Sequence, residues 1–200
     1  VTGSHIRGVQ IDGILPVSVI SADDVDAIAP NSGAEMLTTM SQADVSLFED
    51  IGSVDRASIQ SARGDVAALN LRGMGSSNTL VLLNGRRVIQ HPGTQFEGNV
   101  IATTVNTNTV PSRGVQRVEV LSDGASALYG TDATAGVVNT VLMKNFEGLT
   151  LSGRYGGAEG IDYNHRTLSA YWGKDFNQGR TNVSVSLNHF VQDGYLATEH

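Results

Sequence analysis

The sequence predicts an α+β protein, in which a mixed sheet with short helices is followed by antiparallel strands. Two features indicate this order. Up to Phe146, short β-branched runs are interrupted by helical segments and glycine-rich turns, whereas later residues alternate between apolar and small polar types. With 200 residues, of which 40% are hydrophobic, the chain is large enough to bury a core.

The composition narrows the range of functions. Charged residues make up 16% of the chain, against about 25% in an average soluble domain, and 23 residues are glycine. Thirteen Lys and Arg against 20 Asp and Glu give a net charge of -7, the wrong sign for a nucleic-acid partner, because phosphate binding requires a basic face. With zero cysteines, a disulfide framework and a thiolate metal site are excluded.

No run of residues approaches the ~20 consecutive apolar residues of a membrane-spanning helix, so a membrane role would have to use strands. The chain begins at Val1 without a basic and apolar signal segment, which we interpret as a processed or trimmed start.

The first predicted elements are a strand and a helix. Leu15 to Ile20 is short and β-branched, which favours a strand. Ser21 followed by Asp24 has the spacing of a capping box, so we expect a helix over Asp23 to Ala29 that ends at Pro30.

The remaining elements of the mixed-sheet domain follow from periodicity and turn residues. Apolar residues at helical spacing predict a second helix over Ala34 to Met40, and the polar segment Ser41 to Arg63 is expected to be a loop. Asn84-Gly85 suits a type I′ hairpin turn. Ala125 to Tyr129 is expected to be helical. Four more strands are predicted, at Val66 to Arg72, Thr79 to Leu83, Val115 to Leu121 and Val137 to Leu142.

After Phe146, apolar and small polar residues alternate in segments of about ten residues, which is the pattern of outer-membrane barrel strands. His189 is the one polar residue on the apolar face of the third segment. The connector Gly157 to Asn164 is interpreted as a long external loop and Asn177 to Arg180 as a short periplasmic turn. Because three strands cannot close a barrel, we expect this part to be the incomplete start of a truncated transmembrane β-barrel.

Three blocks of sequence, in this order, resemble the plug domain of TonB-dependent outer-membrane receptors. They are VTGSHI with PVSVISADDVDAI, then NLRGMGSSNTLVLLNGRRV from Asn70 to Val88, and VPSRGVQRVEVLSDGASALYGTDATAGVVNTVLMKN from Val110 to Asn145. The resemblance implies a plug domain over residues 1–146, with a flexible segment at 1–10, and about three strands of a barrel over 147–200. A full barrel of this kind has about 22 strands.

The family resemblance implies transport and no enzymatic activity. The expected place is the bacterial outer membrane, with the plug inside the barrel lumen facing the periplasm and lipid around the barrel. The expected partners are TonB, energised by the inner-membrane proton-motive force, and a small ligand: an iron-siderophore or similar chelate, with cobalamin, haem, nickel chelates and oligosaccharides also open. No cofactor is implied. The alternative is a stand-alone soluble periplasmic module that binds or interacts without transporting.

The same resemblance implies functional roles for particular residues of this chain. Val1 and Thr2 match the end of the TonB-contacting segment, which pairs as an extended strand, or else belong to a disordered remnant. Arg72 and Arg117 match plug arginines that lock the plug to acidic residues of the barrel wall, because a guanidinium forms bidentate bonds in a confined site. Their alternative role is that of solvated strand-end charges, and Glu119 lies on the same strand face as Arg117 and could pair with it.

Two plug loops are expected to face the external ligand by the same analogy, at Asp50 to Arg63 and Gln90 to Thr104. Their polar or aromatic candidates are Arg56, Gln60, His91, Gln95 and Phe96, which are otherwise ordinary loop residues.

Glycine and aspartate positions are interpreted as turn chemistry, and no catalytic or metal site is predicted. Glycines permit positive φ or close strand approach, and Asp123 suits a turn and a helix cap. These structural turn residues are Gly73, Gly85, Asp123, Gly124, Gly130 and Gly136. The five histidines lie too far apart for a zinc pair, and the Gly73 segment lacks the third glycine of a nucleotide-binding loop.

Overall fold

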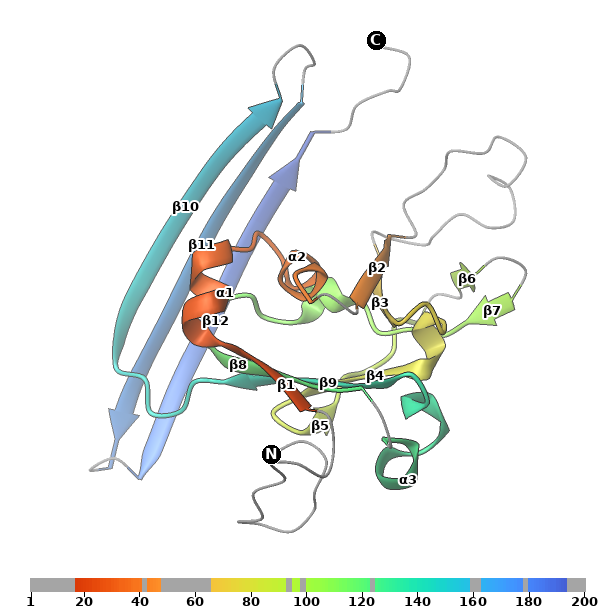
Figure 1. Cartoon of the computed structure of the whole chain (residues 1–200). Coiled ribbons are helices and arrows are strands. Elements are labelled where there is room, and N and C mark those ends of the chain that lie inside the picture. The colour runs from red at the N-terminus through yellow and green to blue at the C-terminus, as the bar shows by residue number, and fades with distance from the viewer. Residues whose placement is uncertain are drawn as a thin grey trace.

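The computed structural model describes residues 17–40, 43–47, 66–92, 95–97, 100–122, 125–158, 163–177 and 180–193. Within these residues two larger sheets meet, as the α+β prediction requires. A five-stranded mixed sheet carries short helices, and a long three-stranded antiparallel sheet stands beside it (Figure 1).

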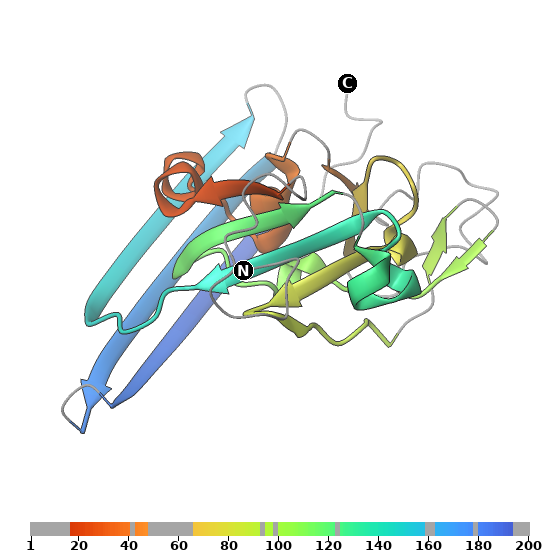
Figure 2. The same ribbon diagram turned by 60° about the horizontal axis from the view of Figure 1, so that its bottom comes forward.

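The mixed sheet has the strand order β1-β8-β9-β4-β5, shown side by side in Figure 2. Its members are β1 (Val17–Ser21), β4 (Thr79–Leu83), β5 (Arg86–Arg87), β8 (Val115–Leu121) and β9 (Gly136–Leu142). β4 and β9 are parallel, and every other pair in this sheet is antiparallel. β1, β4, β8 and β9 confirm four of the predicted strands, although Leu15 and Pro16 of the first one lie outside the described residues. Asn84 and Gly85, with φ of 52° and 77°, form the predicted tight turn between β4 and β5.

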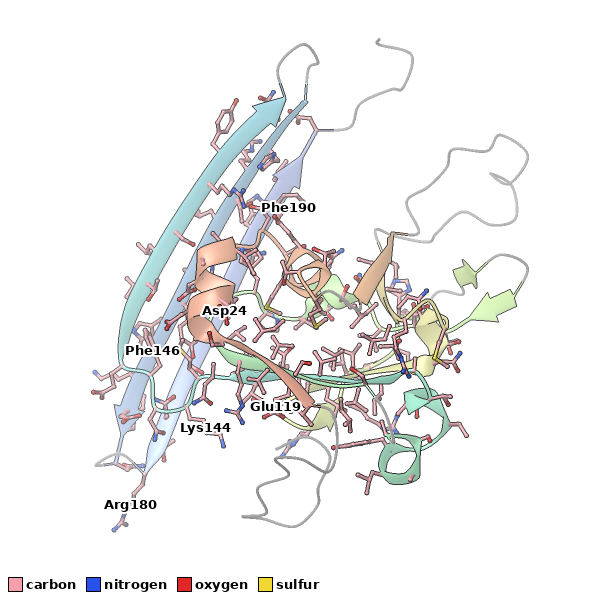
Figure 3. The ribbon with its side chains drawn as sticks, viewed as in Figure 1. Asp24, Glu119, Lys144, Phe146, Arg180 and Phe190 are labelled. Atoms are coloured by element: carbon pink, nitrogen blue, oxygen red, sulfur yellow. The ribbon has the colours of Figure 1, made fainter. Side chains whose placement is uncertain are left out.

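Two helices cover one face of this sheet. They are α1 (Ala22–Ile28) and α2 (Gly33–Thr38), and the Ser21–Asp24 capping box predicted for α1 is present. The core beneath them is formed mainly by Met36 and Leu37 from α2 with Val118 and Val138 from the sheet, each at most 1% exposed. Figure 3 shows side chains filling the layer between the helices and the sheet.

A second, smaller core lies on the other face of the sheet, formed by Leu80, Leu82, Leu121 and Val137. The short element η3 (Thr131–Ala133) contributes Ala133 to this core, and Tyr129 from α3 (Ser126–Tyr129) packs against the edge of the core. The remaining described elements are η1 (Ser76–Asn78), η2 (Thr107–Thr109), β6 (Gln95–Glu97) and β7 (Val100–Ala102).

The predicted loop over Ser41 to Arg63 is wrong at its start. Ala43–Leu47 forms β2, which pairs antiparallel with β3 (Ala67–Leu71). The segment is polar overall, but Ala43, Val45 and Leu47 alternate with Asp44 and Ser46, which is the period of a strand with one buried face.

The second sheet consists of β10 (Gly148–Ala158), β11 (Tyr163–Phe176) and β12 (Thr181–Gln192) in antiparallel order. Its strands are longer than the pattern predicted, because Gly157 and Ala158 still pair with Asn164 and Tyr163. The predicted contrast between a long loop and a short turn is therefore wrong, since residues 159–162 and 177–180 are connectors of equal length. Glycine and polar residues extended the ladder because backbone pairing needs no apolar side chain.

The second sheet has two unlike faces. On β11, Thr167, Ser169 and Tyr171 are at most 7% exposed, and they point toward the mixed-sheet domain. The opposite face carries exposed apolar side chains, at Leu149, Leu151, Tyr155, Leu168, Trp172, Val183, Val185 and Leu187. This is the reverse of a water-soluble sheet, whose apolar face is the buried one.

Candidate functional site

The polar face of the three-stranded sheet is bonded to the turn between α1 and α2, and Asn31 is the centre of this contact. Thr167 on β11 donates its hydroxyl to Asn31 Oδ1 at 2.8 Å, and Asn188 on β12 donates its amide to the Asn31 carbonyl at 2.8 Å. The Asn31 N–H donates to Glu35 Oε2 at 2.7 Å. One residue therefore ties the helical layer to two neighbouring strands.

Neighbouring groups orient this contact. Ser169 donates to Asn188 Oδ1 at 2.6 Å, which aims the amide nitrogen of Asn188 at the Asn31 carbonyl. Arg154 on β10 donates to the Ala29 carbonyl at 3.0 Å and lies 3.7 Å from Glu35. Both of these charged side chains are more than a third exposed, so their ion pair adds at most about 1 kcal/mol. All three strands contact the turn, and the contact is polar.

A second contact between the sheets is a close fit of Gly114 against Tyr171. A Cβ atom at residue 114 would lie 2.3 Å from a ring carbon of Tyr171, and Gly114 has φ of +74°. Only glycine satisfies both conditions without strain. The Tyr171 ring also lies 4.7 Å, between centroids, from Phe146, which Figure 3 labels at the junction of the two sheets.

The two arginines predicted to lock the plug lie in the mixed-sheet domain and bond within it. Arg72 is exposed and donates to the Ala135 carbonyl at 3.3 Å. Arg117 donates to Glu119 at 2.8 Å, and Asn139 donates to the other carboxylate oxygen at 3.2 Å. Glu119 is 3% exposed, so Arg117 neutralises a buried carboxylate. A bond from either arginine to the barrel wall stays a prediction.

The predicted ligand-facing residues are described only in part. His91 donates its backbone N–H to the Thr104 carbonyl at 2.7 Å and lines a hollow of about 860 Å³. Gln95 and Phe96 belong to β6, where the backbone alone is described. Arg56 and Gln60 lie outside the described residues, as do Val1 and Thr2 of the predicted TonB-contacting segment.

The predicted turn residues fall into two groups. Gly73, Gly85, Gly130 and Gly136 have φ of 67°, 77°, 98° and 141°. At Gly136 a Cβ atom would also lie 2.6 Å from the Leu121 carbonyl oxygen, so β9 begins by close approach to β8. Asp123 and Gly124 lie outside the described residues.

Sequence reasoning did not identify Asn31, Thr167, Asn188 or Gly114. Asn31 precedes the N-cap residue Ser32 of α2, where it looks like ordinary turn chemistry. The alternation of β11 and β12 did place Thr167 and Asn188 on the polar face, and that was the available signal. Their partner could not be found from spacing, because 136 residues separate Asn31 from Thr167.

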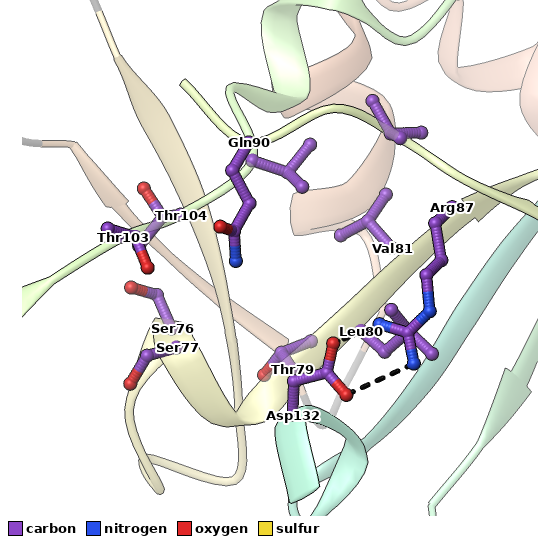
Figure 4. Close-up of a pocket in the computed structure, with 12 residues that line it drawn as sticks. Ser76, Ser77, Thr79, Leu80, Val81, Arg87, Gln90, Thr103, Thr104 and Asp132 are labelled. Atoms are coloured by element: carbon purple, nitrogen blue, oxygen red, sulfur yellow. Dashed lines mark hydrogen bonds and ion pairs between the residues drawn. The ribbon is translucent and has the colours of Figure 1, made fainter. Parts of the chain in front are cut away.

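A polar chamber of about 310 Å³ lies inside the mixed-sheet domain (Figure 4). Hydroxyl groups line it from η1, β4 and residues 103–104, with Gln90 and an ion pair between Arg87 and Asp132. Within the described residues, no group of three or more metal-ligating side chains is found. None of the helices in those residues is long and apolar enough to cross a membrane.

Fold and interface together define a small mixed-sheet domain docked on the polar face of a sheet whose other face is apolar, which is the arrangement of a plug beside the wall of a membrane barrel. The family model of the TonB-dependent Receptor Plug Domain matches residues 10–137. The chain belongs to this family, which consists of transport receptors and not of enzymes.

Curated relatives give the same picture. The ferric enterobactin receptor PirA of Pseudomonas aeruginosa is 32% identical over 130 residues, which cover 64% of this chain and 16% of that protein. The vitamin B12 transporter BtuB of Photobacterium profundum is 27% identical over 128 residues, which cover 64% of this chain and 18% of that protein. The chain thus spans less than a fifth of the length of these relatives.

Solved structures share the fold. A crystal structure of the ferric enterobactin receptor of Pseudomonas aeruginosa with enterobactin superposes with a TM-score of 0.66 at 24% identity, over 90% of this chain and 25% of that one. The siderophore receptor PirA of Acinetobacter baumannii gives a TM-score of 0.64 at 20% identity, over 87% and 24%. Because these alignments extend past residue 146, they include strands of the second sheet as well as the plug.

Proposed function

We propose that this chain forms the plug and the first wall strands of an active transporter in the outer membrane of a bacterium. The observation that carries the proposal is the two-faced sheet β10–β12. Its polar face bonds Asn31 and encloses Tyr171 against Gly114, while its other face exposes apolar side chains such as Leu151 and Leu168. That combination suits a wall between lipid and a plugged lumen.

In this proposal the plug closes a pore that would otherwise leak. A barrel of about 22 strands has a lumen wide enough for a metal chelate, so a folded domain must occupy it. TonB pairs with the extended segment at Val1 and Thr2 and draws on the proton-motive force of the inner membrane. Arg72 and Arg117 hold the plug to the remaining wall, and the plug faces the periplasm.

The proposed cargo is a ferric siderophore or a similar chelate. Two curated relatives are named ferric enterobactin receptors, and another is named a vitamin B12 transporter, so cobalamin is the second candidate and oligosaccharides a third. Arg56, Gln60, His91, Gln95 and Phe96 are the proposed ligand-facing residues of the plug. The first four offer hydrogen bonds, and Phe96 offers a flat face for stacking.

The alternative of a stand-alone soluble module is not favoured by the outer face of β10–β12. Eight large side chains on that face are at least 39% exposed. Exposed apolar surface of this extent marks an interface with a membrane or a partner, because its contact with water is unfavourable.

Uptake measurements test the proposal. The test uses cells whose uptake of ferric enterobactin depends on the receptor containing this sequence. When the chelate carries radioactive iron, these cells should accumulate the label only when TonB is present. Cells that lack TonB should still bind the chelate at the surface. Equal uptake with and without TonB would contradict the proposal, and a protein recovered only in the periplasmic fraction would support the soluble module.

A further inference from the structure

A single extended segment separates two hollows of the plug. This strap, Arg86 to Pro92, follows the β4–β5 turn. Arg87, Val88 and Gln90 line both the polar chamber of about 310 Å³ and the more open hollow of about 860 Å³, whose linings otherwise share no residue. The strap is therefore the wall between them, and moving it would join the two.

Polar groups make up most of the chamber lining, and Leu80, Val81, Val88 and Val105 supply its apolar part. Ser77, Thr79 and Thr103 contribute hydroxyl groups, and Arg87 and Asp132 contribute charge (Figure 4). Thr104 is 2% exposed, and its hydroxyl oxygen has no hydrogen-bond partner among the described residues. Buried hydroxyl groups are normally hydrogen-bonded, so this oxygen is an unsatisfied polar group at the edge of the chamber.

Within the described residues, backbone bonds hold the strap at both ends, and Arg86 and Arg87 also pair with β4. The Val88 N–H donates to the Val81 carbonyl at 3.3 Å, and the His91 N–H donates to the Thr104 carbonyl at 2.7 Å. Between them Ile89 is 90% exposed. In contrast, β8 and β9 at the centre of the sheet bury nearly every side chain between the two cores. The segment with fewer buried contacts is the one expected to open first.

A side-chain latch completes the hold on the strap. Arg87 donates to both carboxylate oxygens of Asp132 and to the Tyr129 carbonyl. The side chain of Arg87 is 52% exposed and that of Asp132 is 34% exposed. An ion pair with this much solvent contact is weak and reversible, which suits a latch that a modest force must release.

We propose that the polar chamber is a transit site for the hydrogen-bonding solute that the receptor imports, and that displacement of the strap is the step that opens it. The inference rests on the proposed transport function and names the place where the plug opens. The chamber alone is at the lower limit for a small-molecule site, whereas the hollow beyond the strap is of ordinary ligand size. Opening therefore means joining the two, while β8 and β9 stay paired.

A reversible crosslink tests the strap. Val81 and Val88 stand opposite each other, one step beyond the register pairs Leu82–Arg87 and Leu83–Arg86. Opposite residues of antiparallel strands have Cα atoms about 4.5–5.5 Å apart, within the range for a disulfide. Val81→Cys with Val88→Cys in the receptor containing this sequence would lock the strap to β4, and the chain itself adds no other cysteine.

The matched control is Val120→Cys with Val138→Cys, which links two opposed buried valines on β8 and β9. TonB-dependent uptake of labelled ferric enterobactin is measured for both variants, first with the cysteine pair oxidised to a disulfide and then after its reduction. The expected result is a loss of at least tenfold in uptake for the oxidised strap variant, with recovery on reduction and with surface binding retained. The oxidised control should transport at the wild-type rate.

Other outcomes overturn the proposal in distinguishable ways. Wild-type uptake by the oxidised strap variant shows that the strap need not move. Equal loss in both oxidised variants shows that the whole sheet rearranges, which also contradicts the strap as the opening step. TonB-independent uptake by the receptor without any substitution refutes the proposed transport function itself. Recovery after reduction in the same cells shows that the cysteine variants fold.

Discussion

Asn31 joins the plug to the three-stranded sheet through two separate groups, its side-chain oxygen and its backbone carbonyl. Only the bond to the side-chain oxygen depends on the residue type. Replacing Asn31 with Ala should therefore remove the bond from Thr167 and keep the bond from Asn188. A hydrogen bond of this kind contributes about 0.5–1.5 kcal/mol.

A double-mutant cycle checks this bond. Asn31→Ala, Thr167→Val and the double variant should be compared by thermal unfolding of the receptor. The double variant should lose less stability than the sum of the single variants, by about 0.5–1.5 kcal/mol. Additive losses would show that the two side chains do not interact.

Gly114 should be intolerant of any side chain. Gly114→Ala would place a methyl group inside the Tyr171 ring at a positive φ, at a cost of about 2–4 kcal/mol in the free energy of unfolding. Calorimetry of the receptor measures this loss. The control is Gly153→Ala, where no atom lies within 4 Å of the added carbon. A Gly114→Ala receptor as stable as the control would show that Tyr171 moves aside freely.

At the level of single elements, the start of α1 depends on pH. Hydrogen bonds from the Ser21 side chain and backbone hold the pKa of Asp24 below its ordinary value. A lowered folded-state pKa stabilises the cap above the unfolded pKa, and this stabilisation is lost as the pH falls through the folded pKa. The cap is therefore complete at neutral pH and fails in acid.

NMR titration of the Asp24 carboxyl measures this effect. Ser21→Ala should raise the pKa of Asp24, because both the hydroxyl bond and the capping geometry are lost. An unchanged pKa in the Ser21→Ala variant would show that the side-chain bond does not set the titration.

The cost of a charged substitution on the outer face of β10–β12 should depend on how deep the substituted position lies in the membrane. Leu151, Ala170 and Leu187 form one row across the three strands, and Arg166 and Val191 share a row nearer the end. If the sheet lies in lipid, Leu187→Arg should cost about 2–4 kcal/mol, because it places a charge at mid-height. Val191→Arg should cost about 0–1 kcal/mol for its depth, with up to about 1 kcal/mol more from repulsion by the opposed Arg166. Urea titration of the receptor folded into lipid vesicles compares the two. Equal costs would contradict a lipid-facing sheet.

At the scale of the whole molecule, the proposed transport function requires that the plug be held in the lumen without being fixed there. Arg72→Ala with Arg117→Ala in the receptor should increase passive leak, because both proposed wall contacts are lost and Glu119 loses its arginine partner. Permeation of a small sugar into vesicles measures the leak. Arg180→Ala, at the tip of the β11–β12 turn, is the control (Figure 3). Unchanged permeability would count against the locking role.

The sequence predicted most strands because local patterns carry the information. Three of these patterns act within a few residues: β-branched runs, the Ser21–Asp24 spacing and the Asn84-Gly85 turn. The local structure that each one favours can therefore be predicted without the rest of the chain. The sequence does not predict β2, because the surrounding segment is polar and the alternation of apolar and polar residues covers only five positions. The extent of β10 and β11 was underestimated because glycine pairs as well as valine through the backbone.

The candidate site was less accessible from sequence. Family resemblance alone points to Arg72 and Arg117, and among the described residues both bond within the plug. The residues that do contact the three-stranded sheet, Asn31 and Gly114, look like turn residues in the sequence. Their partners lie on strands far along the chain, and no spacing rule connects them.

The sequence by itself determined the order of elements, the two unlike faces of the last strands and the family of the plug, because these depend on short-range pattern and motif. The tertiary structure alone decided which polar groups meet. Asn31 is opposite Thr167, and the strap lies between two hollows, because the packing of the helical layer and the sheet places distant segments side by side. Long-range contacts follow from packing, and packing is a property of the whole chain.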